Sequence, residues 1–139
     1  MSIKYSLLFL LLIYSCKKIE IRNNNAKDID EATEFGKMYY SKIGKVDFSE
    51  SGKFFGGEIT PDDGINLLKK INSLYGNLLH SEISKIQTEV RIENGETTKS
   101  YIIETDVEYS KEKCHEIINI KNFGNLLKVV GYHSSIVIK

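Results

Sequence analysis

The spacing of apolar side chains changes its period at Gly76, and this change constrains the fold more than any other feature of the sequence. Before Gly76 apolar residues recur every three or four positions, which is typical of helices. Beyond it they alternate with polar residues, which is typical of strands with one wet face. The alternation predicts four strands, near residues 78–92, 97–110, 113–121 and 126–138.

Two turn signals join the predicted strands. Asn94-Gly95 is the favoured two-residue hairpin sequence, and residues 122–125 supply a second turn. Strands connected so tightly run antiparallel, so we expect an α+β fold with helices on one face of a curved four-stranded antiparallel meander. In the second strand the acids Glu104, Asp106 and Glu108 should face water. The opposite set should face the helices: Tyr101, Ile103, Thr105, Val107 and Tyr109.

Two helices are expected before the sheet. The first is predicted over residues 28–43, with Asp28 or Asp30 as its N-cap. The second begins at Thr60-Pro61, where threonine caps the helix and proline fills its first position, and ends at a left-handed Gly76. A short helix or turn between them carries three aromatic side chains: Phe48, Phe54 and Phe55.

The first sixteen residues have the order of an export signal. Lys4 precedes an apolar run over residues 7–13, which is shorter than the roughly 20 residues that span a bilayer, and the small Ser15 follows. Residues 13–16, Ile-Tyr-Ser-Cys, resemble a bacterial lipobox, in which the cysteine is lipidated on sulfur. The resemblance implies a signal peptide over residues 1–15, an acylated Cys16, and a membrane-anchored location in the bacterial cell envelope. The alternative is an uncleaved membrane anchor or a buried strand in this region.

Length and charge limit the remainder of the chain. Removal of residues 1–15 from 139 leaves 124, which suits one domain, and we assign 16–27 to the lipidated cysteine and a polar tether and 28–139 to that domain. Loss of Lys4 leaves 18 basic and 19 acidic side chains, a net charge of −1 that argues against a nucleic-acid partner. With Cys16 acylated, Cys114 has no partner for a disulfide. We expect it to be a small buried residue, the alternative being a reactive or metal-bound thiolate.

The order of elements over residues 28–139 resembles the cystatin-like, NTF2-like superfold of small bacterial exported domains. The matching residues are Gly76, Glu108-Tyr109 and the sequence Val-Val-Gly-Tyr at 129–132. The resemblance implies a curved sheet that wraps a helix to form a conical pocket. In some families the pocket hosts an enzyme, and in others it is empty or binds a ligand. It also implies that a homodimer can form through the open face of the sheet, near Ile102.

Two functions remain open for such a domain. The first is a non-catalytic module that binds a small ligand or an envelope protein. Its candidate ligand-binding residues are Tyr39, Tyr101 and Tyr109, which core packing explains equally well. The alternative is an enzyme acting on a small apolar substrate in the cone, with Asp106 or Glu104 as general base.

Metal and cofactor chemistry has little support in the sequence. The histidines lie on different predicted strands, and none belongs to a short ligand-spacing motif: His80, His115 and His133. No serine lies in a nucleophile elbow, and no glycine loop has a phosphate-binding form. We therefore predict neither a metal site nor a cofactor.

Overall fold

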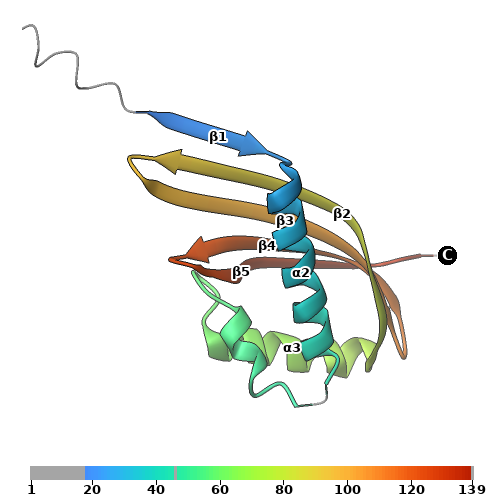
Figure 1. Cartoon of the computed structure of the whole chain (residues 1–139). Coiled ribbons are helices and arrows are strands. Elements are labelled where there is room, and N and C mark those ends of the chain that lie inside the picture. The colour runs from blue at the N-terminus through green and yellow to red at the C-terminus, as the bar shows by residue number, and fades with distance from the viewer. Residues whose placement is uncertain (1–17, 46, 139) are drawn as a thin grey trace, which may run out of the picture.

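The computed structural model describes residues 18–45 and 47–138, which form an α+β fold (Figure 1). Helix α2 crosses one face of an antiparallel sheet, and α3 lies near the lower end of α2. In chain order the elements are β1 (Ile19–Asn23), α2 (Ala26–Ile43), the 3-10 helix η2 (Ser51–Phe54), α3 (Pro61–Tyr75), β2 (Leu78–Glu93), β3 (Glu96–Tyr109), β4 (Lys113–Phe123) and β5 (Leu126–Ile136).

The sheet has five strands in the order β1-β2-β3-β4-β5, with every neighbouring pair antiparallel. The predicted strands are present as β2 to β5, but the prediction of a four-stranded sheet is wrong. The sheet is open, and β1 and β5 are its edges.

The extra strand, β1, lies in the segment predicted to be a tether. Ile19 pairs with Glu93, and the pairing continues to Asn23 opposite Glu89, so the prediction of a polar tether is wrong over these residues. Five residues are too few for an alternating pattern to stand out, and β1 forms because the long strand β2 offers it a free edge.

Both predicted hairpin turns are confirmed. Asn94 and Gly95 have φ angles of 53° and 83°, and they connect Glu93 directly to its partner Glu96. In the second turn, Gly124 at φ 60° allows Phe123 to pair with Leu126. Positive φ at these positions suits asparagine and glycine, which have little steric penalty there.

The predicted N-cap is confirmed for α3 but not for α2. Thr60 caps α3 as predicted, because its Oγ1 accepts a hydrogen bond from the Asp63 backbone N–H at 3.2 Å. The N-cap of α2 is Asn25 rather than Asp28 or Asp30. Asp28 is instead buried in the first turn and faces Arg22 of β1 at 3.2 Å, an ion pair that exists only because β1 joins the sheet.

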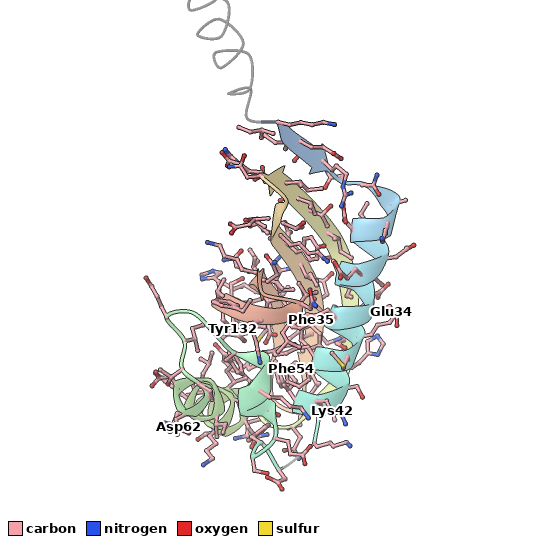
Figure 2. All side chains as sticks on the ribbon, turned by 60° about the vertical axis from the view of Figure 1, so that its left-hand side comes forward. Glu34, Phe35, Lys42, Phe54, Asp62 and Tyr132 are labelled. Carbon is pink, nitrogen blue, oxygen red and sulfur yellow. The ribbon has the colours of Figure 1, made fainter. Side chains whose placement is uncertain are left out.

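The core lies between the helices and the inner face of the sheet. The inward-facing residues of β3 are buried as predicted, from Tyr101 to Tyr109, and the acids between them lie on the outer face. Phe35 of α2 meets Phe54 of η2 edge to face in the interior, with ring centroids 6.0 Å apart (Figure 2). Within the described residues no helix is both long enough and apolar enough to cross a membrane.

Gly64 gives a test of this packing. An added Cβ at Gly64 in α3 would overlap the ring of Phe55, so Gly64→Ala should destabilise the protein by roughly 1–3 kcal/mol despite the better helix propensity of alanine. Urea unfolding measures the loss. In a Phe55→Ala background, which removes the ring atoms that the added Cβ would meet, the same substitution should cost much less, and an equal cost in both backgrounds would contradict the contact.

Candidate functional site

The most unusual feature of the interior is a buried carboxylate, that of Glu116 in β4. The residue is 0% exposed, and its oxygens accept hydrogen bonds from three tyrosine hydroxyls. Tyr109 of β3 and Tyr132 of β5 donate to Oε1 at 2.6 and 2.7 Å, and Tyr40 of α2 donates to Oε2 at 3.1 Å. Three elements on different sides of β4 are therefore held to one side chain, and we call these four residues the Glu116 cluster.

The alternation of β4 places Glu116 inside the protein. Cys114, Ile118 and Ile120 share its face and are all buried, and Glu116 is paired in register with Thr105 of β3. Sequence reasoning missed this residue. The available signal was an acid at an inward position between apolar residues of one strand.

Burial and hydrogen bonding act in opposite directions on this carboxyl group. Burial raises the pKa of Glu116, and the hydroxyl groups that donate to it reduce the rise. Burial, followed by the nearby charge of Glu116, also raises the pKa of the tyrosines Tyr40, Tyr109 and Tyr132. The phenols therefore stay protonated and act as hydrogen-bond donors.

The predicted ligand-binding tyrosines do not form one site. Tyr109 belongs to the Glu116 cluster. Tyr39 is fully buried beside Tyr40, with ring centroids 5.1 Å apart, and its hydroxyl has no hydrogen-bond partner among the described residues. Tyr101 lies elsewhere, where its hydroxyl donates to Glu31 at 2.5 Å.

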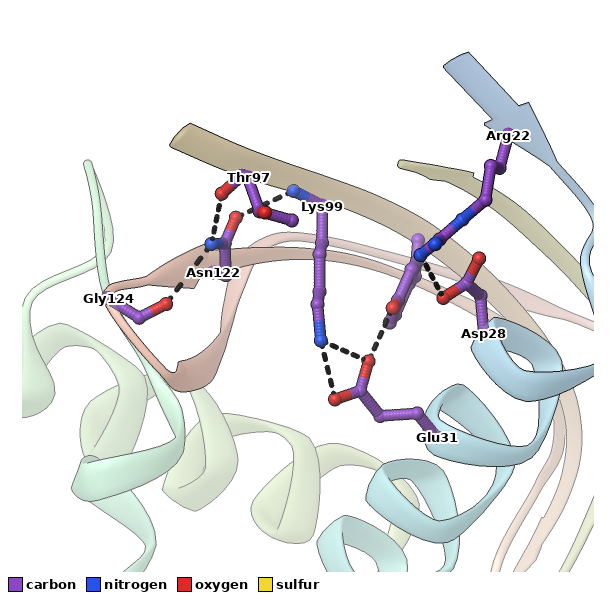
Figure 3. A network of polar contacts seen from close by, with 8 residues as sticks. Arg22, Asp28, Glu31, Thr97, Lys99, Asn122 and Gly124 are labelled. Atoms are coloured by element: carbon purple, nitrogen blue, oxygen red, sulfur yellow. Dashed lines mark hydrogen bonds and ion pairs between the residues drawn. The ribbon is translucent and has the colours of Figure 1, made fainter. Parts of the chain in front are cut away.

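Tyr101 is part of a second polar network near the start of α2 (Figure 3). Lys99 of β3 donates to both carboxylate oxygens of Glu31 at 2.7 Å. Burial alone would raise the pKa of Glu31, but its bonds with Lys99 and Tyr101 outweigh burial and lower it. The Arg22–Asp28 pair lies beside this network (Figure 3). These contacts hold the first turns of α2 against β1 and β3. The role of this network is therefore structural.

The two predicted candidate bases lie on the outer face of the sheet. His115 of β4 sits between them, with Nδ1 2.8 Å from Asp106 and Nε2 3.3 Å from Glu104. The hydrogen bond with Asp106 is the main cause that raises the pKa of His115. The side chains of Glu104 and Asp106 are 23% and 63% exposed, so neither carboxylate reaches the interior where a cone would lie.

Among the described residues, the remaining candidate positions do not have the arrangement of a metal site. Cys114 is buried, as predicted, and burial raises the pKa of its thiol. Among residues 18–45 and 47–138 no group of three or more His, Cys, Asp or Glu side chains has a geometry that could hold a metal ion. Cys16 and the signal peptide predicted over residues 1–15 lie outside the described residues.

An open groove of about 590 Å³ runs between α2 and β2, and we call it the α2–β2 groove. Its α2 wall includes Tyr40, whose hydroxyl reaches Glu116 on the inner side. Gly36 allows the helix to approach closely, because an added Cβ would lie 2.9 Å from Cδ1 of Ile83. The pairing of β2 is irregular here, between Ile83 and Lys85. The groove is lined by Ile29, Thr33, Gly36, Lys37, Tyr40, Ser81, Glu82, Ile83, Ser84, Lys85 and Ile86.

Comparison of the sequence with protein-family models gives no match, and comparison with curated proteins gives no significant one. The geometry of the chain itself therefore carries the functional argument.

The pH dependence of stability tests the Glu116 cluster. Because the folded-state pKa of Glu116 is raised, the folded protein binds more protons than the unfolded chain, and stability falls as pH rises from about 4.5 through that pKa. Glu116→Gln removes this titration. The free energy of unfolding of the variant, relative to that of the wild type, should therefore increase from pH 4 towards pH 7, which means that the variant becomes relatively more stable.

Urea unfolding across that pH range measures the effect. Glu112→Gln is the matched control, because Glu112 is exposed in the turn before β4. Its substitution should give the same pH profile as the wild type. A Glu116→Gln profile parallel to that of the wild type would contradict a raised pKa.

Proposed function

We propose that this chain is a non-catalytic binding domain, anchored by lipid in the bacterial cell envelope, and that the α2–β2 groove receives its ligand. The groove carries the proposal. Its volume of about 590 Å³ is within the range of small-molecule sites, which is about 300–1,000 Å³. Apolar side chains from both walls, Ile29, Ile83 and Ile86, are flanked by Lys37 and Lys85. This composition suits a small ligand, or a protein side chain, with an apolar body and a polar end.

The architecture supports assignment to the cystatin-like, NTF2-like superfold. One helix crosses the inner face of an antiparallel meander, and the strands follow one another in sequence order. In that superfold the space between helix and sheet holds a ligand in some families and is empty in others. In this chain aromatic side chains and the Glu116 cluster fill that space. The proposed ligand site therefore lies beside the helix, in the α2–β2 groove.

Binding is favoured over catalysis by the positions of the acids. An enzyme using Asp106 or Glu104 as general base needs a substrate beside the outer face, where these carboxylates are already bonded to His115. Glu116 is in an apolar interior, but its oxygens accept three hydroxyl donors and it does not line the α2–β2 groove. A general base needs a free lone pair within reach of the substrate proton.

Features of the sequence support the proposed anchor and partners. Lys4, the apolar run over residues 7–13 and Ser15 before Cys16 support export and acylation, for example by palmitate. The partners we propose are the membrane, through Cys16, and a small ligand or an envelope protein in the groove. A second copy of the chain is a further partner, through the outer face around the half-buried Ile102.

Cys16→Ala tests the anchor. The wild type, expressed in a bacterium, should carry added acyl mass and fractionate with membranes, because several buried acyl methylenes each contribute about 0.8 kcal/mol. The variant should lack that mass and lose membrane retention. Intact mass spectrometry and fractionation measure both, and Cys114→Ala is the matched control. Equal retention of wild type and Cys16→Ala, without acyl mass on either, would reject the anchor.

Ser84→Trp tests the groove. Ser84 lines the groove, is exposed and donates to the backbone carbonyl of Glu104 at 3.2 Å. Ser135 is a matched serine on β5, exposed and bonded to the carbonyl of His115 at 3.4 Å. An indole at position 84 should fill the groove and abolish binding of an anilinonaphthalene sulfonate probe, whereas Ser135→Trp should leave binding unchanged.

The measurement is the change in emission of the probe as folded protein is added. Binding that is equal in both variants and in the wild type would place the probe outside the groove and contradict the proposal.

A further inference from the structure

The position of β1 limits how far the domain can stand from a membrane. The sheet begins at Ile19, and only Lys17 and Lys18 separate this residue from Cys16. An extended chain spans at most about 3.6 Å per residue, so the three steps from Cys16 to Ile19 cover about 11 Å. If Cys16 is acylated, as proposed above, the first strand is held almost at the headgroups rather than at the end of a long tether.

The register of the sheet decides which end lies near the anchor. Ile19 is paired with Glu93, directly before the β2–β3 turn. In an antiparallel meander the β4–β5 turn lies at that same end, and Figure 1 shows both turns on the side where β1 begins. The β3–β4 turn and Leu79, near the start of β2, lie at the other end.

The β4–β5 turn has the side chains of a membrane contact. Phe123 and Leu126 are directly paired and are 47% and 63% exposed. The next pair along the hairpin is Asn122 with Leu127, followed by Lys121 with Lys128. Lys121 is exposed, whereas Nζ of Lys128 donates to the backbone carbonyl of Lys53. Apolar side chains at a loop tip enter the boundary of headgroups and acyl chains, and an exposed lysine beside them, such as Lys121, is attracted to anionic headgroups.

We propose that the β4–β5 turn, with Phe123 and Leu126, docks into the anionic bilayer surface that holds Cys16. The lipid and the turn are then two contacts on one surface, so the domain has a fixed orientation. The neighbouring β2–β3 turn carries Glu93 and Glu96, which disfavour an anionic surface, although Glu93 is paired with Arg91 at 3.1 Å. This difference selects the β4–β5 turn as the part that inserts.

Docking in this orientation leaves the α2–β2 groove open. Its β2 wall, residues 81–86, lies at least seven residues along the strand from Glu93. At about 3.3 Å per residue, that wall stands more than about 20 Å from the anchored end. A ligand would be received on the side of the domain that faces away from the bilayer.

A single-tryptophan reporter tests the proposal, since the chain contains no tryptophan of its own. Leu126→Trp places the reporter in the turn, and Leu79→Trp is its matched control, because these leucines are 63% and 65% exposed at opposite ends of the sheet. Each acylated full-length protein is reconstituted in vesicles of phosphatidylethanolamine and phosphatidylglycerol, with and without bromine on the acyl chains.

We expect the emission of Leu126→Trp to shift to shorter wavelength on the vesicles and to be lost with brominated lipid, because interfacial side chains lie about 5–10 Å into the boundary region. Leu79→Trp should show neither change. Phe123→Trp is a second reporter in the turn, used if Leu126→Trp does not unfold cooperatively in urea.

The outcomes separate this inference from the proposed anchor. Vesicle-bound, acylated protein whose position-126 and position-123 reporters both stay unquenched would overturn docking and leave the anchor standing. Equal quenching at positions 126 and 79 would also overturn it, since the domain would have no preferred orientation. Protein without acyl mass that stays off the vesicles would overturn the anchor, and docking with it.

Discussion

The Glu116 carboxylate is the constraint around which the interior is arranged. An ionised carboxylate buried without partners costs several kcal/mol, so its oxygens must be satisfied by hydrogen bonds. Tyr40, Tyr109 and Tyr132 supply them from α2, β3 and β5. Bonds to a charged group contribute roughly 1.5–3 kcal/mol each, and they are directional. The crossing of α2 over the sheet is thus held by polar geometry in addition to apolar burial, and the space that a ligand would need inside the fold is occupied.

The two faces of the sheet carry different chemistry for a simple geometric reason. Neighbouring residues of a strand point in opposite directions, so Glu116 and His115 are adjacent in sequence yet lie on opposite sides of β4. Glu116 is enclosed by phenols, whereas His115 lies among the carboxylates of the outer face. A function that uses the outer acids and one that uses the interior are therefore spatially separate. The groove beside α2 is the feature that lies between core and surface, since Tyr40 contributes to both.

Much of the fold was predictable, because local patterns report it well. The change of period at Gly76, the Asn94-Gly95 turn and the Thr60 cap all act within a few residues, and the structure confirms each turn and the cap. Strand β1 was not predictable in the same way, since five residues form a strand only where a partner edge exists. The Glu116 cluster was also missed. Its donors lie 76, 7 and 16 residues away in sequence, and no local pattern links them.

The amino-acid sequence by itself determined the α+β class, the boundaries of β2 to β5 and the start of α3, because periodicity and turn chemistry act over short range. Tertiary structure decided which acid is buried, which tyrosines meet it, and that the polar segment over residues 19–23 joins the sheet as its edge strand β1. These depend on register and on helix placement, where a shift of one residue exchanges the two faces of a strand. The proposed anchor at Cys16 would lie close to the domain for the same reason, since each residue that joins the sheet shortens the segment between them.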